Sequence, residues 1–175
     1  DDNVLRQTTA RLPWLLIGMI GGIGNSMILG NFDSTFAAHP EMALYIPLIG
    51  GTGGNVGTQS SAIIVQGLAN SSLDAKNTFK QITKESVVAL INATIISLLV
   101  YTYNFIRFGA TATVTYSVSI SLFAVVMFAS IFGTLVPMTL EKFKIDPAIA
   151  TGPFIAITND IIGMMLYMGI TVLLS

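Results

Sequence analysis

One carboxylate, Asp160, lies in the middle of a long segment in which no other side chain is charged. Residues 147–174 are long enough to cross a hydrocarbon core of about 30 Å at about 1.5 Å per residue, which predicts that Asp160 lies near the bilayer midplane. An acid at that depth costs at least about 2.5–3.5 kcal/mol, and such acids usually face an ion or proton pathway. Asp160 is therefore the leading candidate for a cation-binding residue. The alternative is a structural pairing with a polar group on a neighbouring helix.

Small residues flank Asp160 on the same face of the predicted helix. Ala156 and Gly163 are four residues before it and three residues after it, and such positions are neighbours on a helix. Pro153 and Tyr167 continue this face. Because Ala156 and Gly163 are small, we expect room beside the carboxylate for a hydrated cation.

Asp146 is a second candidate metal ligand. If the helix is continuous, Asp146 points within about 40° of Asp160 and lies about 21 Å from it along the axis. One acid would then mark the mouth of a pathway and the other its midpoint. The alternative is that Asp146 only caps its helix, since Asp followed by Pro147 is typical of a helix start.

A glycine-rich stretch, PLIGGTGGNVGTQ, occupies residues 47–59. Proline and repeated glycine weaken a regular helix, and irregular backbone within a membrane occurs where it lines a cavity or is buried in protein. We therefore expect this stretch to line the same ion path, with a close-packing face as the alternative. The candidate pore-lining residues are Gly53, Gly54, Asn55, Thr58, Gln59, Pro153 and Gly163.

The composition excludes several other classes of site. Hydrophobic residues make up 53% of the chain and charged residues 10%, and the mean hydropathy is +0.75, which is typical of a protein in a lipid bilayer. The net charge of −1 gives no basic surface for nucleic acid. Cysteine is absent and His39 is the single histidine, so a bound cation is expected to be hard and held by oxygen.

The pattern predicts an all-α membrane protein with five transmembrane helices. The expected spans are about residues 14–37, 42–69, 86–108, 117–140 and 147–174. Residues 1–12 are polar and are expected to be the end of a cytoplasmic linker helix, so that residues 13–175 form the transmembrane pore domain of a longer protein. The third and fourth spans carry no internal charge and are expected to be scaffold. Residues 70–85 are expected to form an interfacial helix, with three lysines spaced four apart.

The basic residues predict the orientation of these spans. A cytoplasmic N-terminus leaves Arg107 as the one basic residue outside. The basic residues on the inner side are then Arg6, Arg11, Lys76, Lys80, Lys84, Lys142 and Lys144. This bias predicts that the N-terminus is cytoplasmic and the C-terminus is outside.

Three motifs together resemble a known family. Arg11, Pro13 and Trp14 open the first span, the glycine-rich stretch forms the second, and DPAIATGPFIAITND at residues 146–160 forms the fifth. In this order they resemble the transmembrane domain of the MgtE magnesium channels and transporters, and the likeness covers nearly the whole chain.

The resemblance implies a homodimer in the bacterial inner membrane, with the ion path between subunits and lined by the second and fifth helices. It implies that Asp160 from both protomers holds Mg²⁺ largely through its water shell, that the Ala156 carbonyl contributes, and that Asp146 lies at the cytoplasmic end. It also implies cytosolic regulatory domains that are missing from this chain. Two acids balance one divalent ion, which is a physical reason to expect the dimer.

The leading hypothesis is therefore a Mg²⁺-selective pore, with Mn²⁺ and Ca²⁺ as alternative ions for the same site. A proton- or Na⁺-coupled secondary transporter is the alternative. An intramembrane hydrolase would need two carboxylates close enough to share a proton, and Asp160 is the one acid expected at depth. We therefore expect no enzymatic activity and no catalytic residues.

Overall fold

The computed structural model describes residues 3–175, apart from the side chains at positions 75 and 150, and these residues form helices joined by short connections. In chain order the elements are α1 (Val4–Gly30), α2 (Asp33–Ala38), η1 (Pro40–Tyr45), α3 (Ile46–Ala69), η2 (Ala75–Asn77), α4 (Thr78–Phe108), α5 (Thr113–Lys142), η3 (Pro147–Ala150) and α6 (Pro153–Leu174). The η elements are short 3₁₀ helices. No strand occurs in this part of the chain, so the predicted all-α class is confirmed.

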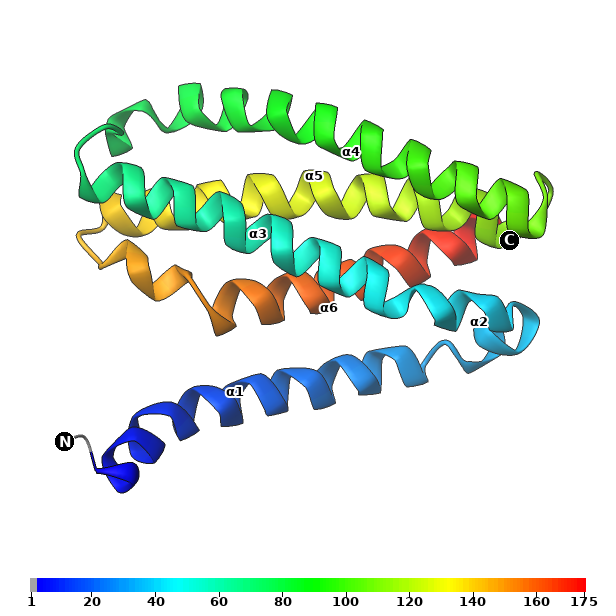
Figure 1. The fold of residues 1–175 in the computed structure, drawn as a ribbon, viewed down its shortest axis with the longest axis horizontal. Coiled ribbons are helices and arrows are strands. Elements are labelled where there is room, and N and C mark those ends of the chain that lie inside the picture. The colour runs from blue at the N-terminus through cyan, green and yellow to red at the C-terminus, as the bar shows by residue number, and fades with distance from the viewer. Residues whose placement is uncertain (1–2) are drawn as a thin grey trace.

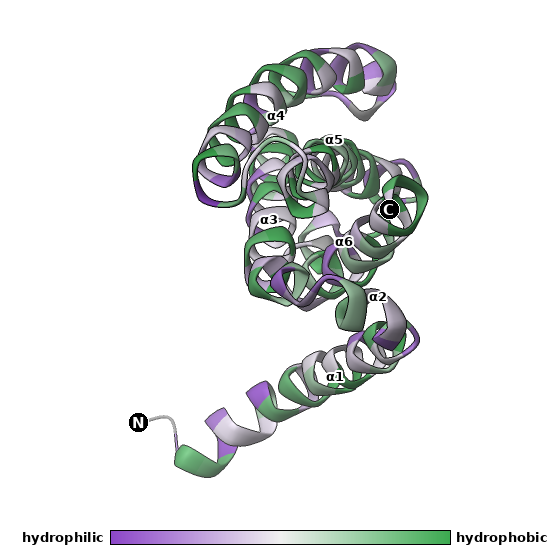
Figure 2. Cartoon of the chain, turned by 90° about the vertical axis from the view of Figure 1, so that its right-hand side faces the viewer, coloured by the Kyte–Doolittle hydropathy of each residue, from purple (hydrophilic) through white to green (hydrophobic). Residues whose placement is uncertain are grey.

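Helix α5 packs against α3, α4 and α6, which lie alongside it (Figure 1). Helix α1 contacts α6 and extends away from the other helices (Figure 2). The N-terminus and the α3–α4 and α5–α6 connections lie at one end of the molecule, and α2, the α4–α5 connection and the C-terminus lie at the other (Figure 1). The basic residues of the N-terminal segment and of those two connections therefore gather at one end.

Four helices of the described residues are long and apolar enough to cross a membrane, namely α1, α4, α5 and α6. Helix α3 has 24 residues, which corresponds to about 36 Å, but its glycines and polar residues keep its hydropathy below that of the other four. Apolar side chains of α1 and α4 are exposed along much of their length, as expected of surfaces in contact with lipid.

Helices α3 and α5 approach each other closely where two glycines meet. A Cβ added at Gly133 would lie 2.6 Å from the backbone oxygen of Gly57, so the backbones themselves are in contact. Ser60 and Ser130 share a hydrogen bond of 3.3 Å beside this contact. Close approach of backbones at small residues is the usual means of helix association in membranes, and it makes α3 and α5 the centre of the scaffold.

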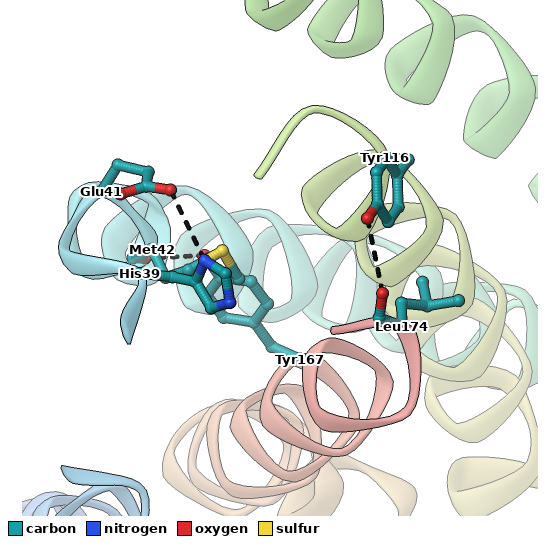
Figure 3. A network of polar contacts seen from close by, with 6 residues as sticks. All are labelled: His39, Glu41, Met42, Tyr116, Tyr167 and Leu174. Atoms are coloured by element: carbon teal, nitrogen blue, oxygen red, sulfur yellow. Dashed lines mark hydrogen bonds and ion pairs between the residues drawn. The ribbon is translucent and has the colours of Figure 1, made fainter. Parts of the chain in front are cut away.

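Hydrogen bonds fix the C-terminal part of α6 (Figure 3). The hydroxyl of Tyr167 donates to the carbonyl oxygen of Met42 at 2.6 Å, and the hydroxyl of Tyr116 donates to the carbonyl oxygen of Leu174 at 3.4 Å. Tyr167 is fully buried. These bonds link α6 to η1 and α5, and they hold the helix that carries Asp160.

The first predicted span is wrong in its boundaries. Helix α1 begins at Val4, where the side chain of Asn3 caps it by accepting a hydrogen bond from the backbone N–H of Leu5 at 3.2 Å. It continues through Pro13 and ends at Gly30, and the separate α2 follows. Helix α1 runs across the boundary predicted between residues 12 and 13, and the division into a linker and a pore domain at that point stays a prediction.

The fifth predicted span is also wrong as a single continuous helix. Gly152 has φ 113° and ψ −139°, a conformation that is essentially limited to glycine, and Pro153 disfavours helical backbone at the residue before it. The chain therefore breaks between η3 and α6. The helical phase and the rise computed from Asp146 to Asp160 do not apply.

The predicted interfacial helix at 70–85 is not a separate element. Its residues 78–85 form the first turns of α4, and the preceding residues form a turn and η2. The basic residues of this stretch still lie at the end of the bundle that the N-terminus shares.

Candidate functional site

The Asp160 carboxylate lies against the glycine-rich face of α3. A Cβ added at Gly50 would lie 3.5 Å from Oδ1 of Asp160, and one at Gly54 would lie 3.7 Å from it. Both glycines are half-buried, as is Asp160. Because Gly50 and Gly54 are one turn apart on α3, their missing side chains leave an open strip of backbone beside the carboxylate.

Asp160 has no hydrogen-bond or ion-pair partner among residues 3–175. The ion pair described for this part of the chain joins His39 and Glu41, at 3.9 Å, just before the start of α3. The structural pairing that was the alternative role for Asp160 is therefore not found within the described chain. A carboxylate that is half-buried and unpaired is suited to interact with a cation.

No group of three or more His, Cys, Asp or Glu side chains converges within the described residues. Within these residues Asp160 therefore has no second acidic or imidazole ligand pair beside it. Mg²⁺ is commonly bound through one or two carboxylates while it keeps several waters, and Asp160 fits that mode of binding.

The other residues predicted on the face of Asp160 differ in their surroundings. Ala156 is half-buried one turn before Asp160, and Pro153 starts the helix. Gly163 is buried, and a Cβ there would lie 3.8 Å from Val125 of α5. Gly163 thus packs on the scaffold within this chain.

The glycine-rich stretch is a regular part of α3. Its residues are either buried against α5, beside Asp160, or exposed. Gly53 is buried, and a Cβ there would lie 2.8 Å from Val125. Gly54 faces Asp160. Asn55, Thr58 and Gln59 are exposed, so α3 presents a polar surface on the side away from α5. The structure thus brings Gly54 and Asp160 together and leaves the three polar residues uncovered in a single chain.

Asp146 is remote from this arrangement. It is exposed, and its Oδ1 accepts a hydrogen bond from the backbone N–H of Ala148 at 3.0 Å, so it caps η3. The capping role that was its alternative is thus present. Asp146 and Trp14 also line an open hollow of about 390 Å³ beside the start of α6.

Several residues near Asp160 were not predicted from the sequence to belong to the site. Gly18, Gly21, Gly22 and Asn25 of α1 line a small cavity with Ile157 and Asp160. The i, i+3 and i+7 spacing from Gly18 to Asn25 was a usable signal for one helix face, but nothing in the sequence indicated that this face meets α6. Asn159 was missed too. Its side chain is 1% exposed, and neither amide atom has a hydrogen-bond partner within the described chain.

Comparison with known proteins gives consistent matches. A family model described as "MgtE: Divalent cation transporter" matches residues 46–170. The chain is 32% identical to the magnesium transporter MgtE of Bacillus subtilis over 160 residues, which is 91% of this chain and 35% of the relative. It is 32% identical to the magnesium transporter MgtE of Thermus thermophilus over 165 residues, or 94% of this chain and 36% of the relative. For the magnesium transporter MgtE of Enterococcus faecalis the identity is 29% over 173 residues, which is 97% of this chain and 37% of the relative. The chain thus spans about a third of the length of these relatives.

Proposed function

Since this chain belongs to the MgtE family of divalent cation transporters, we propose that it forms the membrane pore for Mg²⁺ and that Asp160 binds the ion as it passes. The family transports ions and is not a family of enzymes. The observation that carries the proposal is the Asp160 carboxylate, which has no partner in the described chain and lies against the glycine face of α3. An unpaired acid in a membrane helix is costly unless a cation or water reaches it.

In this proposal Asp160 holds the ion through water. Mg²⁺ gives up its first-shell water reluctantly, and Gly50 and Gly54 place no side chain over Oδ1 that would exclude those water molecules. The Ala156 carbonyl and the Asp146 carboxylate contribute along the path. Binding through water also keeps the ion weakly held, which conduction requires. Mn²⁺ and Ca²⁺, which also prefer oxygen ligands, are secondary candidates.

The pore is proposed to form between two copies of the chain. Two Asp160 carboxylates balance the charge of one divalent ion. A second chain would also cover the exposed polar residues of α3, which are unfavourable in contact with lipid. These residues, Asn55, Thr58 and Gln59, would then line the pore together with Gly54 and Pro153, whereas the predicted pore-lining residues Gly53 and Gly163 pack against α5.

In the same proposal α3 spans the membrane as a fifth helix, since it lies alongside α4, α5 and α6 in the bundle. The basic residues at the N-terminal end give a cytoplasmic N-terminus and an outer C-terminus. The membrane is the bacterial inner membrane. Residues 1–12 belong to a linker from cytosolic regulatory domains, which the family resemblance implies.

The test is Mg²⁺ flux into liposomes that contain the purified chain and a Mg²⁺-sensitive dye. Asp160→Asn keeps the size of the side chain and removes its charge, so flux should fall to background while the protein still inserts and elutes as the wild type does. Near-normal flux in this variant would end the proposal. Flux that depends on an imposed proton or Na⁺ gradient would favour a coupled transporter over a pore.

A further inference from the structure

The cavity between α1 and α6 contains hydrogen-bond acceptors from both helices. It has a volume of about 60 Å³ and is lined by Gly18, Gly21, Gly22, Asn25, Ile157 and Asp160. The side chains that supply polar atoms are the Asp160 carboxylate and the Asn25 amide. The Oδ1 atom of Asn25 is buried and has no hydrogen-bond partner within residues 3–175. An acceptor that is buried without a donor is unfavourable, and a water molecule in this cavity would satisfy it.

The position of Asn25 follows from the contact between the two helices. Helix α1 lies close to α6 at Gly21, where an added Cβ would lie 2.5 Å from Cγ2 of Ile157. Asn25 is one turn after Gly21 on α1, and Asp160 is about one turn after Ile157 on α6. Added Cβ atoms at Gly18 and Gly22 would meet nothing within 4 Å, which leaves the cavity open along α1.

The cavity size limits what the donor can be. One water molecule needs about 10–15 Å³ of such space, so about 60 Å³ holds a few waters. On the same measure, the six waters of a hydrated Mg²⁺ ion would need about 60–90 Å³. The cavity is therefore large enough for part of the water shell of an ion.

We propose that Asn25 is a further ion-binding residue, which accepts a hydrogen bond from the water shell of the divalent cation at Asp160. This inference rests on the proposed function of Asp160. A hydrated cation directs its water hydrogens outward, so it donates to both the Asp160 carboxylate and the Asn25 carbonyl oxygen. Asn25 thus brings α1 into the site, in addition to α3 and α6. Its oxygen binds the ion indirectly, at the distance of one water.

The experiment measures the apparent Mg²⁺ affinity of the reconstituted chain from flux at increasing Mg²⁺ concentration. Asn25→Leu is close in size and removes the acceptor, and it should weaken the apparent affinity about tenfold or more, as expected for the loss of a hydrogen bond to a charged partner. Asn25→Asp keeps an acceptor at the same position and should retain the wild-type affinity or strengthen it. Ser26→Ala is the matched control, because Ser26 is the neighbouring polar residue on α1 and is exposed; it should leave the affinity unchanged.

The two proposals fail in different ways. If Asp160→Asn abolishes flux and Asn25→Leu leaves the affinity at the wild-type value, the role of Asn25 is refuted and that of Asp160 stands. If Asp160→Asn retains flux, the proposed function itself fails. If Asn25→Leu does not fold, Asn25→Ser provides the second comparison, since its shorter hydroxyl keeps an acceptor. An apparent Mg²⁺ affinity of Asn25→Ser that is weaker than that of the wild type supports the proposal. A wild-type affinity in both Asn25→Ser and a folded Asn25→Ala variant refutes it.

Discussion

Replacing Gly54 by alanine tests whether the open backbone beside Asp160 is needed for ion binding. The added methyl group would lie 3.7 Å from Oδ1 of Asp160, which is ordinary van der Waals contact, so α3 and α6 need not move apart. A water bound to the carboxylate lies about 2.7 Å from its oxygen, and a methyl carbon keeps other atoms about 3.5 Å away. The methyl group and a water cannot both occupy the side of Oδ1 that faces Gly54.

The expected loss is one hydrogen bond between the carboxylate and the water shell of the ion. Such a bond contributes about 1.5–3 kcal/mol, so Gly54→Ala should weaken the apparent Mg²⁺ affinity by about 10- to 150-fold. The affinity is read from flux into liposomes and, independently, from the Mg²⁺ concentration that stabilises the protein against heat.

Gly169→Ala is the matched control. Gly169 is on α6 with Asp160, and an added Cβ there would meet nothing within 4 Å. The Gly169→Ala protein should therefore bind Mg²⁺ with the affinity of the wild type. A well-folded Gly54→Ala protein with wild-type affinity would refute the reasoning, because the space above Gly54 would then not be used by the water of the ion.

Three further substitutions test the scaffold by thermal unfolding in detergent. Gly133→Ala should destabilise the protein by about 1–3 kcal/mol, as overpacking does, because its Cβ would meet the backbone oxygen of Gly57 at 2.6 Å; wild-type stability would contradict the close α3–α5 contact. Tyr167→Phe should cost about 1 kcal/mol through loss of the bond to Met42, and an unchanged melting temperature would show that this bond contributes nothing. Gly152→Ala should cost about 1–3 kcal/mol because of its positive φ, whereas a stabilised variant would indicate that the chain is helical at this position.

The sequence predicted the helical class and the special status of Asp160 because both depend on local pattern. An apolar run long enough to cross a membrane specifies a helix by itself, and α4 and α5 contain the predicted spans 86–108 and 117–140. A single acid within such a run can be recognised as unusual from the sequence alone. The glycine-rich stretch was predicted to line an ion path, and its residue Gly54 lies beside Asp160.

The sequence did not predict features that depend on contacts between helices. The break before α6 required weighing Gly152 and Pro153 against a strongly apolar segment, and the backbone conformation of Gly152 is what stops the helix. The cavity at Asn25 exists because α1 meets α6 at Gly21 and Ile157. Such a crossing depends on tertiary packing and is not encoded by spacing within either helix.

The most direct test of the central proposal is a crystal structure with Mn²⁺ in place of Mg²⁺, in which the anomalous signal locates the metal. We expect one peak between two copies of the chain, about 4–5 Å from both Asp160 carboxylates, which is the distance expected when water lies between metal and ligand. A well-ordered structure with metal bound elsewhere, and none near Asp160, would contradict it.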